Sequence, residues 1–230
     1  MKQLLTTGIV LSRTDYGEAD RIITILTPDY GKLRLMARGV RKVKSKLAGG
    51  IELFSTSHVT FIQGRGEIGT LVSTRLITHY GRIIKNIERV QLGYELIKTL
   101  HRATEDNSEA AYFEVLQTAF VALDDPAVDL QLIQLWFLAQ LLKLAGHTPN
   151  LLTDATGQKL TADSNYNFDF DNMLFTPHPR GGVRAEHIKS LRLLFSAYPP
   201  DRLENIDGLN QALPAVAPLI RAMLTSYIRV

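Results

Sequence analysis

The chain has 230 residues, a length that suits one large domain or two small ones. With 45% hydrophobic and 21% charged residues, its composition is that of a folded globular protein and excludes disordered, collagenous and membrane-spanning classes. It contains no cysteine, which excludes disulfides, thiol catalysis and thiolate zinc sites.

The net charge of +3 is unevenly distributed along the chain. Residues 1–80 hold 12 Lys and Arg against 6 Asp and Glu, whereas residues 81–230 hold 14 against 17. The hydrophobic pattern also changes near residue 80, so we predict one domain over 1–80 and a second over 81–230. No apolar run is long enough to cross a bilayer and the N-terminus does not read as a signal peptide. We therefore expect a cytoplasmic, nucleoid-associated protein with no membrane partner.

The first 80 residues are rich in predicted strands. Five β-rich runs, at 7–13, 21–27, 32–37, 58–63 and 70–76, are separated by turn sequences such as Pro28-Asp29-Tyr30-Gly31. Five strands in this length suit a small closed all-β barrel of the OB type, and an SH3-like barrel is the alternative.

The third predicted strand runs into a strongly basic stretch. Its residues 32–46 include seven cations and no acid, and like charges gathered in this way indicate a polyanionic partner such as nucleic acid. A solvated loop is the other interpretation. An eighth cation, Arg65, is expected at a hairpin tip. The predicted binding residues are Lys32, Arg34, Arg38, Arg41, Lys42, Lys44, Lys46 and Arg65.

A G-x-G-x-x-G sequence at residues 64–69 resembles a dinucleotide-binding motif, which needs a helix directly after it. Strand-forming residues follow instead. The glycines therefore indicate a hairpin.

Beyond residue 83 the apolar period becomes helical. Val90, Tyr94, Ile97 and His101 share one face of a first helix, and residues 112–123 supply a second. Asp125-Pro126 is expected to cap a third, mostly apolar helix that ends at Gly146. Residues 150–183 indicate an irregular lobe with a short hairpin. Two closing helices are expected, at 185–197 and, after the breakers Pro214 and Pro218, at about 215–229.

Sequence signatures for ATP hydrolysis, zinc hydrolysis and acyl transfer are missing, so we expect no catalytic residues and no enzyme. Asp163, Asp169 and Asp171 are oxygen ligands for a hard cation in principle, but a solvated acidic loop is the simpler interpretation. His178 and His187 are interpreted as surface histidines.

In its N-terminal part the chain resembles the bacterial recombination mediator family RecO. The resemblance is dense over residues 8–76 and rests on motifs in order: Gly8-Ile9-Val10-Leu11, Tyr16-Gly17-Glu18-Ala19-Asp20, residues 27–31, Ala37-Arg38-Gly39-Val40-Arg41, Ser45 with Leu47-Ala48-Gly49-Gly50, Phe54, and Gly64-Arg65-Gly66-Glu67 followed by Thr70-Leu71.

This resemblance implies an OB-fold followed by a helical domain, which together bind single- and double-stranded DNA and anneal complementary strands in repair of DNA damage. It implies work with RecR to help load RecA onto DNA coated by the single-stranded-DNA-binding protein. Many relatives carry a four-cysteine zinc motif, which residues 150–183 lack, so we expect no zinc and no other cofactor.

A basic barrel can hold two strands close enough to pair by displacing their counterions, with no nucleotide. Tyr16, Tyr30, Phe54 and Phe61 are candidates for base stacking, although each also suits a core position. For the tail of the single-stranded-DNA-binding protein, the helical half offers Lys143, Arg184, Lys189 and Arg192. An RNA-binding OB protein and an adaptor that uses only its helical half are the alternative functions.

Overall fold

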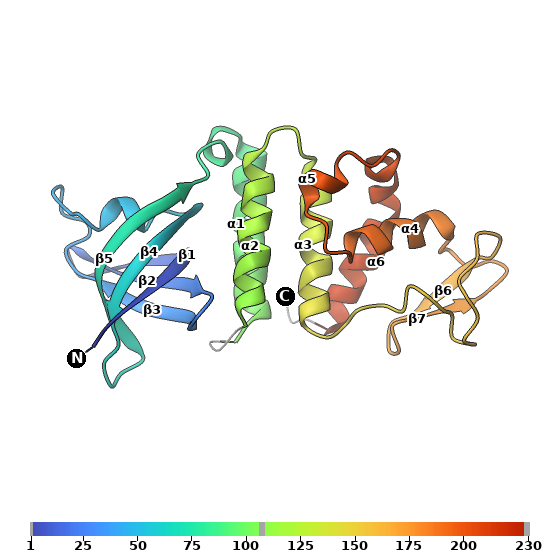
Figure 1. The fold of residues 1–230 in the computed structure, drawn as a ribbon, viewed down its shortest axis with the longest axis horizontal. Helices are drawn as coiled ribbons and strands as arrows, with labels where there is room; N and C mark the ends of the chain where they lie inside the picture. Colours follow the sequence, from blue (N-terminus) through green and yellow to red (C-terminus); the bar gives the residue numbers. More distant parts are fainter. Residues whose placement is uncertain (1, 106–108, 228–230) are drawn as a thin grey trace. The chain divides into compact units, whose positions relative to one another are not determined.

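The computed structural model describes residues 2–105 and 109–227, and they form two compact units. One unit is Met1–Asp125 and the other is Pro126–Val230 (Figure 1). The first joins the predicted barrel with two helices that pack on it, whereas the second is mainly helical. The domain boundary predicted near residue 80 coincides with the end of the last barrel strand and stays a prediction.

The first unit is built on a closed barrel of five strands. They are β1 (Gln3–Tyr16), β2 (Asp20–Thr27), β3 (Gly31–Ala37), β4 (Ser55–Ile62) and β5 (Ile68–His79), in the order β1-β2-β3-β5-β4. β3 and β5 are parallel, and every other neighbouring pair is antiparallel. The predicted OB-type barrel is confirmed.

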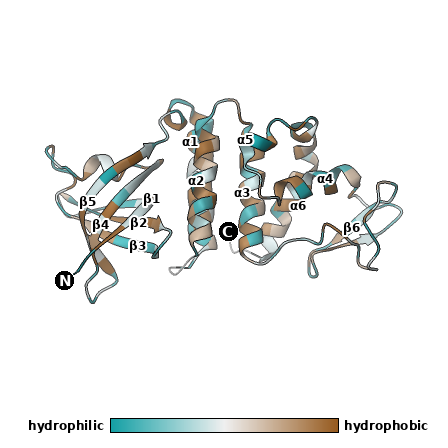
Figure 2. Ribbon diagram, viewed as in Figure 1, coloured by the Kyte–Doolittle hydropathy of each residue, from teal (hydrophilic) through white to brown (hydrophobic). Residues whose placement is uncertain are grey.

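The barrel core follows from the alternation of apolar and polar residues along the strands (Figure 2). Ile23, Leu35, Val59 and Phe61 point inward from different strands and are almost completely buried. The short helix η1 (Ala48–Gly50), together with Ile51, packs against this core, and the Thr74 hydroxyl donates to the Leu47 carbonyl. The glycine-rich sequence at 64–69 connects β4 to β5 as the predicted hairpin.

Two helices, α1 (Ile87–Ala103) and α2 (Ala110–Asp124), follow the short helix η2 (Ile83–Lys85) and contact strands of the barrel. Of the predicted face of α1, Ile97 is buried and the half-exposed Tyr94 packs edge-on against Phe54, whereas His101 is exposed. The buried face instead includes Arg89, whose guanidinium donates to the Leu123 carbonyl, and Gly93, which lies against Phe54. Hydropathy does not reveal a buried face that contains an arginine and a glycine.

The second unit contains α3 (Leu130–Leu144), α4 (Ala185–Leu194), α5 (Pro200–Leu203) and α6 (Leu209–Tyr227), with α3 packed against α4, α5 and α6. The cap predicted at Asp125-Pro126 is wrong, because α3 begins after Asp129. The Asp129 carboxylate accepts a hydrogen bond from the Leu132 amide. The end of α3 at Gly146 is confirmed, with the glycine at φ +82°.

Helix α6 begins earlier than predicted and includes both prolines that we expected to precede it. Pro214 and Pro218 are four residues apart and exposed, so the carbonyls they leave without an N–H donor can be hydrated. The opposite face of α6 buries Leu213, Val216 and Ile220. Apolar packing therefore outweighs the loss of two helical hydrogen bonds.

The irregular lobe at 150–183 carries the predicted hairpin as β6 (Tyr166–Asp169) and β7 (Leu174–Pro177). Its core is aromatic, with Phe168 packed edge-on against Phe170 and Phe175. Among the described residues, no helix is long and apolar enough to cross a bilayer.

Candidate nucleic-acid interface

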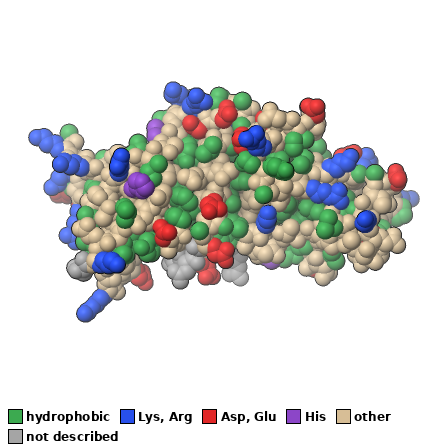
Figure 3. All heavy atoms as spheres, viewed as in Figure 1, with side chains coloured by type: hydrophobic (Ala, Val, Ile, Leu, Met, Phe, Trp, Pro, Cys, Tyr) green, Lys and Arg blue, Asp and Glu red, His purple; other side chains and the backbone are tan. Residues whose placement is uncertain are grey.

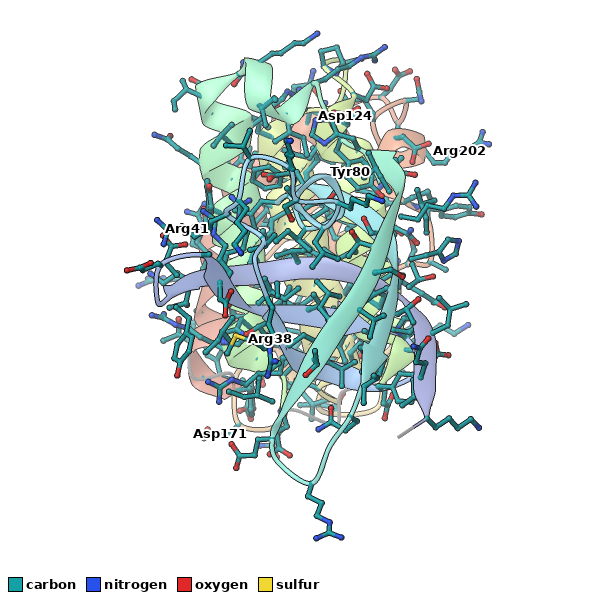
Figure 4. All side chains as sticks on the ribbon, turned by 90° about the vertical axis from the view of Figure 1, so that its left-hand side faces the viewer. Arg38, Arg41, Tyr80, Asp124, Asp171 and Arg202 are labelled. Atoms are coloured by element: carbon teal, nitrogen blue, oxygen red, sulfur yellow. The ribbon has the colours of Figure 1, made fainter. Side chains whose placement is uncertain are left out.

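The eight predicted binding residues all belong to the barrel, where Lys and Arg side chains gather over strands and loops (Figure 3). Lys32 and Arg34 lie on β3, and Arg65 lies in the β4–β5 hairpin loop. The other five occupy the connection between β3 and η1, here named the basic loop, residues 38–47: Arg38, Arg41, Lys42, Lys44 and Lys46. Figure 4, which faces the barrel, shows Arg38 and Arg41 on this side.

The basic loop is fixed to the turn between β1 and β2 by two backbone contacts. The Gly39 amide donates to the Asp20 carboxylate at 2.6 Å, and the Arg41 amide donates to the Ala19 carbonyl at 2.9 Å. Gly39 has φ +64°, a left-handed conformation that favours glycine. The start of the loop therefore has a defined position on the barrel.

The Arg41 side chain is partly engaged within the protein. Its guanidinium lies 3.6 Å from the Asp15 carboxylate and donates to the Gly17 carbonyl at 3.3 Å. Asp15 also accepts from Arg21 at 2.7 Å, and this hydrogen bond, reinforced by the charges of Arg41 and Arg21, holds the pKa of Asp15 below its usual value. Arg41 thus helps to fasten the loop.

Six of the eight predicted cations have no hydrogen bond or ion pair through their side chains within the described part of the chain, and all six are exposed. Because no carboxylate neutralises them, their summed field is available to an anion in solution. They are Arg34, Arg38, Lys42, Lys44, Lys46 and Arg65.

Lys32 differs from the other seven. Its ammonium donates to the His101 carbonyl at 3.2 Å and to the Thr104 carbonyl, at the C-terminal end of α1. A cation at a helix C-terminus stabilises the unpaired carbonyls there. Lys32 therefore joins β3 to α1, a contact over some 70 residues of sequence for which no local signal exists.

Sequence reasoning missed Arg75 on β5. This residue pairs across the strands with His58 on β4, and both side chains are exposed. β5 has register shifts on either side of this pair, which disturb the simple alternation along the strand. The exposure of Arg75 therefore follows from how β4 pairs with β5, which the residue pattern of β5 alone does not indicate.

The four candidate stacking residues separate into two groups. Phe54 and Phe61 are buried, and Tyr30 packs edge-on against Phe61. Tyr16, in contrast, is 56% exposed at the end of β1. Only Tyr16 and Tyr30 of these four offer ring surface to solvent.

Across the described ranges, the structure has no cluster of three or more His, Asp and Glu residues that is able to hold a metal ion. Asp169 accepts hydrogen bonds from the side chain of Asn172 and from the amides of Asp171 and Asn172, which hold its pKa below the usual value. His178 and His187 each accept from a nearby backbone amide. These groups serve local turns and a helix start.

In the second unit, two of the four basic residues expected to meet a protein tail lie together. Lys189 and Arg192 line a pocket of about 160 Å³ with Leu160 and Ile188. Arg192 also donates twice to the Leu151 carbonyl. Lys143 instead contacts the Phe195 carbonyl, and Arg184 is the N-cap residue of α4.

Fold and site define a class: an OB-type barrel with a basic loop in which four of the five cations are unneutralised, followed by a mainly helical unit. The model of the family "Recombination protein O N terminal" matches residues 1–80, and that of "Recombination protein O C terminal" matches residues 85–229. The chain belongs to the recombination protein O (RecO) family, whose members function in DNA repair and recombination.

Several curated relatives carry the name "DNA repair protein RecO". The protein from Dehalococcoides mccartyi is 33% identical over 163 residues, which cover 70% of this chain and 64% of that relative. The protein from an Exiguobacterium species is 27% identical over 96% of this chain and 89% of its own length. That from Listeria welshimeri is 28% identical over 87% and 80%. The chain thus spans just under two thirds of the first relative and most of the other two.

Proposed function

We propose that this protein is a non-catalytic recombination mediator that binds single- and double-stranded DNA through the six free cations of its barrel. The observation that carries the proposal is the basic loop, fixed to the β1–β2 turn while Arg38, Lys42, Lys44 and Lys46 stay unneutralised. Because no carboxylate neutralises these cations, the phosphates of DNA pair with them. The counterions that had condensed on the DNA are then released. Such contacts are directed at the backbone and indifferent to base sequence.

Annealing follows from the same electrostatics. Two complementary strands repel each other through their phosphates, and a cationic surface lowers this repulsion while the bases pair. No step requires ATP or a metal ion. In the cell, the protein works with RecR to help load RecA onto DNA coated by the single-stranded-DNA-binding protein.

For the coated DNA, we place the tail of the single-stranded-DNA-binding protein at the pocket beside α4. Lys189 and Arg192 supply positive charge, and Leu160 and Ile188 supply apolar surface, a combination that suits an acidic peptide with an apolar end. A tail peptide should bind the full chain, and Lys189→Glu should weaken it. Lys159→Glu is the matched control, an exposed lysine of the same unit that does not line the pocket.

The deciding experiment is annealing of complementary DNA coated with the single-stranded-DNA-binding protein, without nucleotide. We expect faster annealing with the full chain than without it, and tighter binding to DNA than to RNA of the same sequence. Preference for RNA would favour an RNA-binding OB protein. Absence of binding to either nucleic acid would favour an adaptor that uses only its helical unit.

A further inference from the structure

Tyr16 is an exposed aromatic residue that takes no part in packing the described fold. It ends β1, pairs across the strands with Asp20, and keeps 56% of its surface exposed. Its ring makes no ring contact and its hydroxyl no hydrogen bond within the described part of the chain. Packing therefore does not explain this side chain.

The backbone around Tyr16 is nevertheless held firmly. Asp15 pairs with Arg21, Gly17 accepts from Arg41, and Asp20 accepts from the amide of Gly39. The residues on both sides of Tyr16 are thus tied to β2 or to the basic loop. Because the turn is already held, a ligand that covers the ring orders only the side chain of Tyr16 and no backbone.

The neighbourhood of Tyr16 offers two kinds of chemistry side by side. The turn that it begins is bonded to the start of the basic loop, where Arg38 and Lys42 carry free positive charge. A nucleotide has two matching parts, because its phosphate is anionic and its base has a flat π face. A base presents that face to a protein only when it is unpaired and unstacked.

We propose that Tyr16 is a stacking position for one unpaired base of single-stranded DNA whose phosphates lie on the basic loop. This inference rests on the proposed function and adds a basis for distinguishing strand types. Interior bases of a duplex already stack on each other, so a duplex contacts the cations alone. Annealing therefore removes the Tyr16 contact, and the double-stranded product is held less tightly than its separate strands.

The test compares Tyr16→Ala with the unchanged full chain on a single-stranded and a duplex oligonucleotide at one salt concentration. Removal of a stacking ring should weaken single-strand binding by about 5- to 100-fold. Duplex binding and the salt dependence of both should stay the same. Tyr16→Phe should keep full affinity, and Tyr16→Leu, which retains apolar bulk at the strand end, should behave like Tyr16→Ala.

Tyr198→Ala is the matched control, since Tyr198 is a 62% exposed tyrosine of the other unit. Equal losses for single strand and duplex in Tyr16→Ala would overturn the stacking role, as would no loss for either. These outcomes leave the proposed function standing. Failure of the unchanged protein to bind any single strand would instead overturn the proposed function itself.

Discussion

The ammonium of Lys32 on β3 donates to the carbonyl of Thr104, the residue that caps the C-terminus of α1. Through this contact Lys32, a basic residue beside the proposed interface, stabilises the fold. We expect Lys32→Met to lower the free energy of unfolding by about 1 kcal/mol, because the helix end loses its cationic donor.

Thermal melting and oligonucleotide binding on one preparation check this expectation. Lys32→Met should melt earlier and keep its DNA affinity per folded molecule. Unchanged melting with weakened binding would move Lys32 into the interface.

The free cations of the basic loop should show the opposite behaviour. In the variant Arg38→Glu/Lys42→Glu/Lys44→Glu, three candidate phosphate contacts become repulsive, so DNA affinity should fall by roughly 100-fold or more at physiological salt. Stability should change by about 0.5 kcal/mol or less, because these side chains are exposed and unpaired. Fluorescence anisotropy and thermal melting measure the two effects.

A matched control separates the loop from a general change in net charge. Lys159→Glu/Arg180→Glu/Arg202→Glu exchanges three exposed cations of the second unit. A similar loss of affinity in this control would show that net charge alone drives binding.

Salt dependence counts the phosphate contacts. If four to six of the free cations contact phosphates, log affinity for single-stranded DNA should fall against log salt with a slope of roughly −3 to −4. A titration from low to physiological salt gives the slope. A value near zero would rule out the electrostatic mechanism.

A substitution at Gly93 tests how closely α1 packs against the barrel. A Cβ at this position would lie 2.5 Å from Cε1 of Phe54, a buried ring that also packs edge-on against Phe120. Gly93→Ala should therefore destabilise the protein by about 1–3 kcal/mol, despite the better helix propensity of alanine.

Denaturant unfolding measures the effect of Gly93→Ala. Gly49→Ala is the control, because a Cβ there would meet no atom within 4 Å. Equal stability of the two variants would mean that the Phe54 ring moves aside without cost.

Asp154 should make the stability of the lobe depend on pH. Its carboxylate accepts from the hydroxyl and amide of Thr156 and from the amide of Gln158, and these bonds lower its pKa below the usual 3.8. A depressed pKa in the folded state stabilises the fold above pH 3.8, and this contribution is lost as the pH falls through the folded value.

Asp154→Asn should therefore be less stable at neutral pH and should lose less stability on acidification. Melting curves between pH 7 and pH 2 test this, with the exposed Asp163→Asn as the control. An identical acid dependence in Asp154→Asn and the unchanged chain would contradict the assignment.

The elements that sequence predicted correctly are those decided by local chemistry. β2, β3 and the β4–β5 hairpin follow from alternation and turn residues, and Gly146 ends α3 through its own φ. The start of α3 was mispredicted because two aspartates, Asp125 and Asp129, suit an N-cap by sequence, and it is Asp129 that a local and a distant contact hold at the helix start. The Asp129 amide donates to Glu204, 75 positions away, while the Asp129 side chain caps the helix.

The same distinction holds for the interface. A run of cations is visible in the sequence, so the position of the basic loop could be predicted, whereas its contacts with DNA stay a prediction. The sequence does not indicate which of these cations lack a partner, because the partners of Lys32 and Arg41 come from other parts of the chain. Likewise, the burial of Phe54 and Phe61 and the exposure of Tyr16 depend on the closed barrel and on the helices packed against it.

The barrel is closed along β3 and β5 by a short parallel ladder, which joins only three residue pairs, Arg34 with Ile68, Leu35 with Gly69 and Met36 with Thr70. Since β3 pairs with β2 over seven residues, the short ladder is the weaker side of this strand. Hydrogen exchange should therefore be fastest along this seam, where opening breaks the fewest bonds. Arg34 lies on one side of the seam and Arg65 belongs to the hairpin on the other. A strand of DNA that contacts both would hold the seam shut, so DNA binding should slow its exchange.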